Sequence, residues 1–218
     1  MNLSIEMVSD LVCPWCWVGL RRFMAALPLV PDLDVDLVFR PFELDPEIPA
    51  GGVDYKAYMK QKFGSDENKS RANTMREALT TYGAAEGIPF QFDRITRRPN
   101  TFDAHRLLSW AQGQGKGLEA KETLFSAFFS EGQDIGDLQV LLTIAAKIGL
   151  DPNITSDLLA SDADSDIIRN EMNMFRQMGI SGVPTFVAHR RIAAQGAETP
   201  EKLAQFLETA AKQVPAEG

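Results

Sequence analysis

The sequence predicts an α/β fold in which a small sheet domain is divided along the chain by a helical insertion. Three features lead to this prediction: a strand–helix–strand order near the start, a long middle part with helical periodicity, and short strands with one helix near the end. We assign residues 1–50 and 175–218 to the sheet domain and residues 51–174 to the helical insertion domain. The two ends of the chain are expected to complete one fold.

The first fifty residues predict two strands joined by a helix. Residues 3–9 form a short apolar run, and apolar residues recur at helical spacing from just after Cys13 until Pro28. Residues 35–44 then alternate apolar and polar side chains in a composition typical of strands. Such a strand–helix–strand unit favours a parallel pair with a right-handed crossover.

The middle of the chain is predicted to be helical almost throughout. Asp137 and Gly149 are suitable residues for the start and the end of one helix, and Pro89 and Pro99 mark residues 88–100 as a loop. Helices are expected at residues 55–63, around 75–82, and at 102–111, 118–129, 138–148 and 167–178.

The pattern returns to strands near the end. Residues 185–188 and 192–194 are expected to form short strands joined by a turn. Thr199 then precedes Pro200 and an amphipathic run, which is typical of a capped final helix.

Composition excludes several classes of protein. The 218 residues are 44% hydrophobic, yet no run of eighteen apolar residues occurs, so no membrane span is expected. The net charge of −8 opposes binding to nucleic acid and to anionic lipid surfaces. The first residues lack a basic segment followed by an apolar one, so we expect a cytoplasmic protein.

The two cysteines are the first feature to explain. Only Cys13 and Cys16 occur in the chain, and chance would give this spacing about once in a hundred arrangements. They lie where the first strand gives way to a helix, and Pro14 suits the first helical turn because its missing N–H would be unpaired there.

This placement favours exchange of disulfides. The unpaired N–H groups and the positive end of the helix dipole stabilise a thiolate at Cys13, which we expect to be the nucleophile. Cys16 lies one helical turn further on the same face, close enough to form a disulfide with Cys13, and is expected to be the resolving thiol.

The cysteines have two other interpretations. A structural zinc site needs four ligands, but there is no second cysteine pair, and His105 and His189 lack the close spacing of zinc ligands. Two inert buried cysteines are also conceivable, although a turn with proline between them is a poor place to bury both. We therefore expect no metal.

A second motif lies before the strands near the end of the chain. Residues 181–185 read Ser-Gly-Val-Pro-Thr, directly ahead of a β-rich run. Alone the signal is weak, because a proline before a strand is often an ordinary turn residue. Together with the cysteine turn it gains weight.

The combination of these motifs resembles the thioredoxin fold in its DsbA-like arrangement, and within it the FrnE-like branch of thiol–disulfide oxidoreductases. The resemblance covers nearly the whole chain. The stretches that carry it are Asp10-Leu11-Val12-Cys13-Pro14-Trp15-Cys16-Trp17-Val18-Gly19, Arg40-Pro41-Phe42-Glu43-Leu44, Asn100-Thr101-Phe102-Asp103-Ala104-His105-Arg106-Leu107, Gly182-Val183-Pro184-Thr185 and Gly196-Ala197.

The resemblance implies roles for further residues. Pro184 is expected to be cis, to abut the cysteines and to shield them from metals, while the main chain of Val183 pairs with an extended substrate segment. Trp15 is a candidate apolar contact for substrate, and Asp10 is either a turn residue or a proton relay. Because Trp15 brings no positive charge, we expect a milder oxidant than the periplasmic DsbA, whose potential is about −120 mV.

The predicted function is exchange of disulfides with protein or peptide thiols, with glutathione as a further candidate partner and no cofactor. One alternative is a glutathione-dependent isomerase or transferase of the related kappa-class and 2-hydroxychromene-2-carboxylate isomerase branch, in which Cys16 would have no role. Another is a non-catalytic holdase. The sequence leaves open the direction of exchange, the choice between monomer and homodimer, and whether Asn100 and His105 line the site or serve as capping and core residues.

Overall fold

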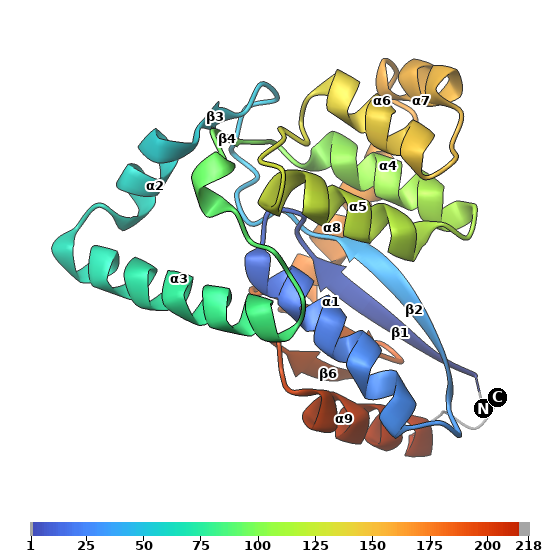
Figure 1. The fold of residues 1–218 in the computed structure, drawn as a ribbon. Helices are drawn as coiled ribbons and strands as arrows, with labels where there is room; N and C mark the ends of the chain where they lie inside the picture. The colour runs from blue at the N-terminus through green and yellow to red at the C-terminus, as the bar shows by residue number, and fades with distance from the viewer. Residues whose placement is uncertain (1, 214–218) are drawn as a thin grey trace.

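The computed structural model describes residues 2–213, and its centre is one four-stranded sheet (Figure 1). The strand order is β2-β1-β5-β6, with β1 and β2 parallel and the other pairs antiparallel. Both ends of the chain therefore build one sheet, as the sequence predicts. The strands are β1 (Asn2–Ser9), β2 (Asp34–Pro41), β5 (Thr185–Ala188) and β6 (Ile192–Gln195).

The two faces of this sheet have different apolar contacts. In β1, Leu3, Ile5 and Met7 belong to the main core, whereas Val8 points to a smaller cluster on the other face. This is the period of two that a strand imposes on its side chains.

Helices from both ends of the chain cover the two faces (Figure 1). The helices α1 (Pro14–Ala26) and α9 (Pro200–Lys212) pack on the main core, where the ring of Phe23 stacks on Phe186 of β5 with centroids 4.9 Å apart. The helix α8 (Ser165–Gln177) covers the opposite face through Phe175. The sheet therefore lies between two layers of helices, and α1 belongs to one of them.

The middle of the chain forms the remaining helices, and α2 and α3 stand out as an arm at the left of Figure 1. Trp15 of α1 contacts Tyr82 near the end of this arm, with ring centroids 5.8 Å apart. The helices are α2 (Tyr55–Phe63), α3 (Asp66–Ala85), α4 (Phe102–Gly113), α5 (Gly117–Phe129), α6 (Leu138–Lys147) and α7 (Pro152–Leu159), with 3₁₀ turns η1 (Leu27–Leu29) and η2 (Phe92–Arg94).

Three local expectations were wrong. The second strand ends at Pro41 rather than continuing to residue 44, because the Leu44 N–H turns away to the carboxylate of Asp10, 2.8 Å from Oδ2. The expected loop at 88–100 contains β4 (Arg97–Arg98), which pairs with β3 (Val53–Asp54). The helix α7 was missed, although Asp151 caps it and Pro152 occupies its first turn.

The expected caps elsewhere are confirmed. The Asp137 carboxylate accepts the N–H of Gln139 and of Val140, and the Thr199 hydroxyl accepts the N–H of Lys202. Within residues 2–213, no helix is both long and apolar enough to cross a bilayer.

An aromatic cluster joins α1 to the helical insertion. Trp17 stacks on Phe125 and Phe129 of α5, with centroids 5.7 and 6.1 Å away, and meets Phe90 edge-on at 5.7 Å. Such aromatic pairs stabilise by more than the burial of their area. The helix that carries the cysteines is thus fixed from the sheet side and from the insertion side.

Candidate functional site

The two cysteines lie at the first turn of α1. Cys13 is the N-cap residue with extended backbone angles, and Pro14 is the first helical residue. The Cys13 N–H donates to the Asp10 carbonyl at 3.2 Å, and the Cys16 N–H donates to the Cys13 carbonyl at 3.0 Å. This hydrogen-bonded turn holds both residues on one side of the helix start, and both thiols are free.

The two thiols differ in exposure. Cys13 retains 4% of its surface and Cys16 retains none. Burial, together with the adjacent Cys13, raises the pKa of the Cys16 thiol well above its ordinary value. Cys16 is therefore a buried, protonated thiol. Cys13 is buried as well and keeps only a small exposed fraction, so the turn buries both cysteines, contrary to the sequence-based expectation.

Pro184 lies against the start of α1, and the Val183–Pro184 peptide bond is cis, which confirms the expectation. The Cys13 thiol donates to the Val183 carbonyl, with the sulfur 3.6 Å from the oxygen. On the other side of Pro184, a methyl group placed on Gly19 would lie 2.7 Å from the proline Cγ. The loop before β5 thus contacts both the outer sulfur and the helix that bears it.

The tryptophans beside Cys16 have separate environments. Trp15 is half-buried and packs against Tyr82 of α3, so part of its ring faces outward. Trp17 is buried in the aromatic cluster, and its indole N–H donates to Glu122 at 2.8 Å.

Asp10 lies buried beneath the cysteine turn. Its Oδ2 accepts the Leu44 N–H at 2.8 Å, and the Nε2 of His105 lies 3.7 Å from Oδ1. Burial would raise the pKa of Asp10, but His105 and the charge of Arg98 outweigh burial and hold it below its usual value. Asp10 is thus ionised and also anchors the turn.

The two residues of undecided role serve structural contacts here. His105 is buried, and its Nε2 lies 3.2 Å from the Phe42 carbonyl. Burial lowers the pKa of His105 despite the opposing charge of Asp10, so the ring is neutral near pH 7. Asn100 bridges two segments, because its amide donates to the Ile48 carbonyl at 2.8 Å and its oxygen accepts the Phe102 N–H at 3.0 Å.

Sequence reasoning missed a lysine in the buried core next to this site. Lys121 of α5 is fully buried, and its Nζ donates to Ser9 Oγ at 2.6 Å. A signal existed: Lys121 shares helical spacing with Leu124, Phe125 and Phe128, which are all buried. A lysine on the apolar face of a phenylalanine-rich helix is uncommon unless something binds it.

A polar cavity of about 260 Å³ lies beside the segment that follows β2. Glu43 lines this cavity and is only 8% exposed. It belongs to a family-like stretch of the sequence, but sequence reasoning gave it no role. Burial, followed by the negative charge of Asp10, raises the pKa of Glu43 to about 7. The other lining residues are Pro46, Ala50, Asn100, Phe102, Asp103, Gly136 and Arg169.

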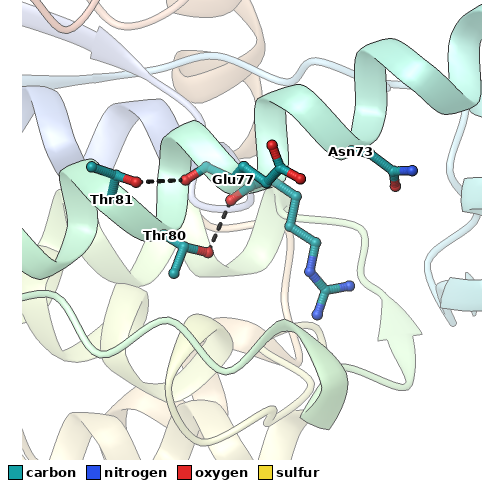
Figure 2. Close-up of a pocket in the computed structure, with 5 residues that line it drawn as sticks. Asn73, Glu77, Thr80 and Thr81 are labelled. Carbon is teal, nitrogen blue, oxygen red and sulfur yellow. Dashed lines mark hydrogen bonds between the residues drawn. The ribbon is translucent and has the colours of Figure 1, made fainter.

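A larger hollow of about 410 Å³ has no such chemistry. Figure 2 shows that the residues lining it come from α3 alone, and that Thr81 and Thr80 bond back to the carbonyls of Glu77 and Arg76 of their own helix. Among the described residues, no three His, Cys, Asp or Glu side chains come together as metal ligands.

Comparisons with known proteins agree with this geometry. The profile of the DSBA-like thioredoxin domain family matches residues 4–208. The Bacillus subtilis protein YwbO is 31% identical over 193 residues, covering 86% of this chain and 87% of YwbO. The crystal structure of a probable DsbA oxidoreductase from Streptomyces coelicolor is 30% identical, with a TM-score of 0.87, and the match covers 99% of this chain and 93% of that one.

A more distant structure shares the fold alone. The cytosolic disulfide reductase DsbM from Pseudomonas aeruginosa, solved with GSH, is 22% identical with a TM-score of 0.61, and the match covers 96% of this chain and all of DsbM.

Proposed function

Since this chain belongs to the DSBA-like thioredoxin domain family, we propose that it is a thiol–disulfide oxidoreductase in which Cys13 is the nucleophile and Cys16 the resolving thiol. One observation carries the proposal: two free, buried thiols, of which only Cys13 keeps a small exposed fraction, share the first turn of α1 beside the cis bond at Pro184. A pair that exchanges disulfides needs this asymmetry.

The reaction begins with Cys13. Its thiolate attacks one sulfur of a substrate disulfide RS–SR′ and forms Cys13–S–S–R, while R′S⁻ leaves and takes a proton. Cys16 then loses its proton and attacks the Cys13 sulfur. The products are the Cys13–Cys16 disulfide and RSH, so the substrate gains two electrons and the protein loses them; the reverse sequence oxidises a dithiol.

Val183, Pro184 and Trp15 are the proposed substrate contacts. Within the described part of the chain, the Val183 N–H donates no hydrogen bond, which leaves it available to an extended peptide. The Val183 carbonyl accepts the Cys13 thiol and can be released when that thiol reacts. The half-buried ring of Trp15 offers an apolar surface next to the sulfur, and Asp10 stays a candidate proton relay.

We propose reduction or isomerisation in the cytoplasm as the physiological direction, within the FrnE-like branch. Thiol pools in that compartment favour reduced cysteines. The fold relationship to DsbM, a cytosolic disulfide reductase solved with GSH, makes glutathione a reasonable reductant of the Cys13–Cys16 disulfide. Two glutathione molecules would restore the dithiol and leave as one oxidised glutathione.

The test compares single replacements of the two cysteines on a disulfide-linked peptide. Cys13→Ser should abolish turnover, since Cys16, the other thiol of the chain, is fully buried. Cys16→Ala should stop turnover after one step and leave the peptide bound to Cys13, which intact-mass measurement detects.

Two results would contradict the proposal. Turnover with glutathione that survives Cys16→Ala would favour the isomerase or transferase alternative, because a resolving thiol has no role there. Full activity of Cys13→Ser, or a Cys13 that iodoacetamide cannot alkylate in the folded protein, would exclude disulfide exchange; protection of unfolded peptide by a variant lacking both cysteines would indicate a holdase.

A further inference from the structure

Lys121 is the buried group that the proposed reaction does not yet use. It lies on α5 with no exposed surface, and Phe125 and Phe39 flank its ammonium, with ring centroids 5.1 and 5.5 Å away. Its hydrogen bond goes to the neutral hydroxyl of Ser9. Among the described side chains, no carboxylate forms an ion pair with it.

A buried ammonium without an anion is unfavourable, because removing the charge from water costs several kcal/mol. The next residue along α5, Glu122, does not compensate it, since Glu122 turns outward to Trp17 and Arg21. No direct ion pair therefore accounts for a lysine at this position, and the ionised Asp10 favours the ammonium only from beyond ion-pair distance.

The groups that face Lys121 come from three other elements. Burial lowers the pKa of Lys121 to about 8, and negative charge on Cys16, Asp10 and Cys13 opposes that change, with Cys16 the strongest. His105 of α4 faces it as well, and the charge of Lys121 helps to keep that ring neutral. In return, the charge of Lys121 lowers the pKa of Cys16, against the larger effect of burial.

Hydrogen bonds connect the lysine to the cysteine turn. Ser9, which accepts the Lys121 ammonium, is the last residue of β1 and directly precedes Asp10. The Asp10 carbonyl in turn accepts the Cys13 N–H. Lys121 is thus fixed beneath the turn from the side of the helical insertion, where Cys16 points inward.

We propose that Lys121 is a positioning residue whose buried positive charge stabilises the Cys16 thiolate during cleavage of the mixed disulfide. This inference rests on the proposed function. In Cys13–S–S–R, the Cys16 S–H bond breaks, the thiolate forms a bond to the Cys13 sulfur, and the S–S bond to R breaks. The proton leaves with RS⁻ as RSH, and Lys121 keeps its own protons.

The test uses stoichiometric Ellman's reagent to measure the reaction of Cys13 and the reaction of Cys16 as two separate kinetic phases. The reduced protein should release one thionitrobenzoate when Cys13 attacks and a second when Cys16 resolves the adduct. In Lys121→Met the first phase should stay within about twofold of the wild type. The second phase should slow about tenfold or more at pH 7, because each unit added to the pKa of Cys16 removes nine-tenths of its thiolate.

Matched variants make the result specific. Lys147→Met makes the same chemical change at an exposed position of α6 and should alter neither phase. Cys16→Ala should release only one thionitrobenzoate; two equivalents from that variant would contradict the proposed function itself. Two results would overturn the role of Lys121 while leaving the proposed function intact. One is a second phase of Lys121→Met that keeps the wild-type rate and pH profile. The other is a first phase of Lys121→Met that is slowed as much as the second.

A measurement on the wild type avoids any dependence on folding of the variant. The Lys121 Cε resonance, followed by NMR through a pH titration, should give a lower pKa in the disulfide form than in the dithiol form. The reason is that the dithiol form can carry a thiolate, first on Cys13 and at higher pH on Cys16, whose charge favours the ammonium, whereas the disulfide carries none. Equal pKa values in the two forms would exclude the coupling.

Discussion

Glu43 shows how a single buried carboxyl can change stability with pH. Its side chain is 8% exposed at the edge of the polar cavity, and its pKa is raised from 4.5 to about 7 by burial and by Asp10. The folded protein therefore holds a proton on Glu43 between pH 4.5 and 7 that the unfolded chain has released. Stability must fall as pH rises through this range and level off above about pH 7.

Replacing Glu43 with Gln should remove this dependence. We expect the variant to gain stability relative to the wild type as pH rises from 5 to 8, by about 1–2 kcal/mol, a value reduced for solvent at the cavity edge. Urea denaturation at several pH values measures this difference, and Glu208→Gln on the exposed face of α9 is the control. A constant difference between Glu43→Gln and the wild type from pH 5 to 8 would disprove it.

For single residues, the sequence predicts which side chains lie at the helix start better than it predicts which charged side chains are buried around them. The position of Cys13 and Cys16 at the start of a helix follows from a short motif, because spacing and turn chemistry are local properties, whereas the cis bond at Pro184 was implied by the family resemblance. Lys121 and Glu43 do not, because their unusual protonation arises from burial among groups that are remote in sequence. Charge on a residue is visible in a sequence, whereas its removal from water is not.

The contact between α1 and the loop before β5 belongs to the scale of elements. Gly19 lies in the second turn of α1, where glycine weakens a helix by about 1 kcal/mol relative to alanine. The structure gives the reason for its presence: an added methyl would lie 2.7 Å from Cγ and 3.4 Å from Cβ of Pro184. The helix can approach the proline ring only at a residue without a side chain.

Gly19→Ala should therefore destabilise the protein despite its better helix propensity. We expect a loss of about 1–3 kcal/mol, typical of overpacking, together with a changed rate of Cys13 alkylation as Pro184 moves. Gly113→Ala at the end of α4 is the matched control, because an added methyl meets no atom within 4 Å there. Equal thermal unfolding midpoints for Gly19→Ala and the wild type would contradict this prediction, because they would show that Pro184 can move away from the added methyl group without loss of stability.

Elements were predicted where their pattern is long enough to read. The amphipathic run of α9 repeats several times, and the predicted position of this helix is confirmed. The ladder of β3 with β4 has two residues in each strand, and no periodicity can be seen over that length. Its register is fixed instead by tertiary contacts such as the Tyr55 N–H, which donates to the Thr96 carbonyl at 2.9 Å.

At the scale of the whole molecule, the sheet domain and the helical insertion are joined through aromatic packing. Phe125 and Phe129 of α5 stack on Trp17 of α1, and Phe90 closes the cluster from the segment after α3. The buried Lys121 and its bond to Ser9 add a polar contact between the same two parts. The division at residues 51–174 thus describes the order of elements along the chain and not two separately packed units. We propose that the two parts unfold together.

Chemical denaturation can test this cooperativity in the full chain. Far-UV circular dichroism reports mainly on the helices, and tryptophan fluorescence reports on Trp15 and Trp17 of α1 and Trp110 of α4. The two transitions should coincide, and Phe125→Ala should shift both by the same amount, about 3–5 kcal/mol, because it opens a cavity where the two parts meet. Ile154→Ala, at an exposed site on α7, should shift neither by more than about 0.5 kcal/mol. If Phe125→Ala separated the dichroism and fluorescence transitions, the two parts would unfold independently. The charge of Lys121 could then be withdrawn from the cysteines by local unfolding alone.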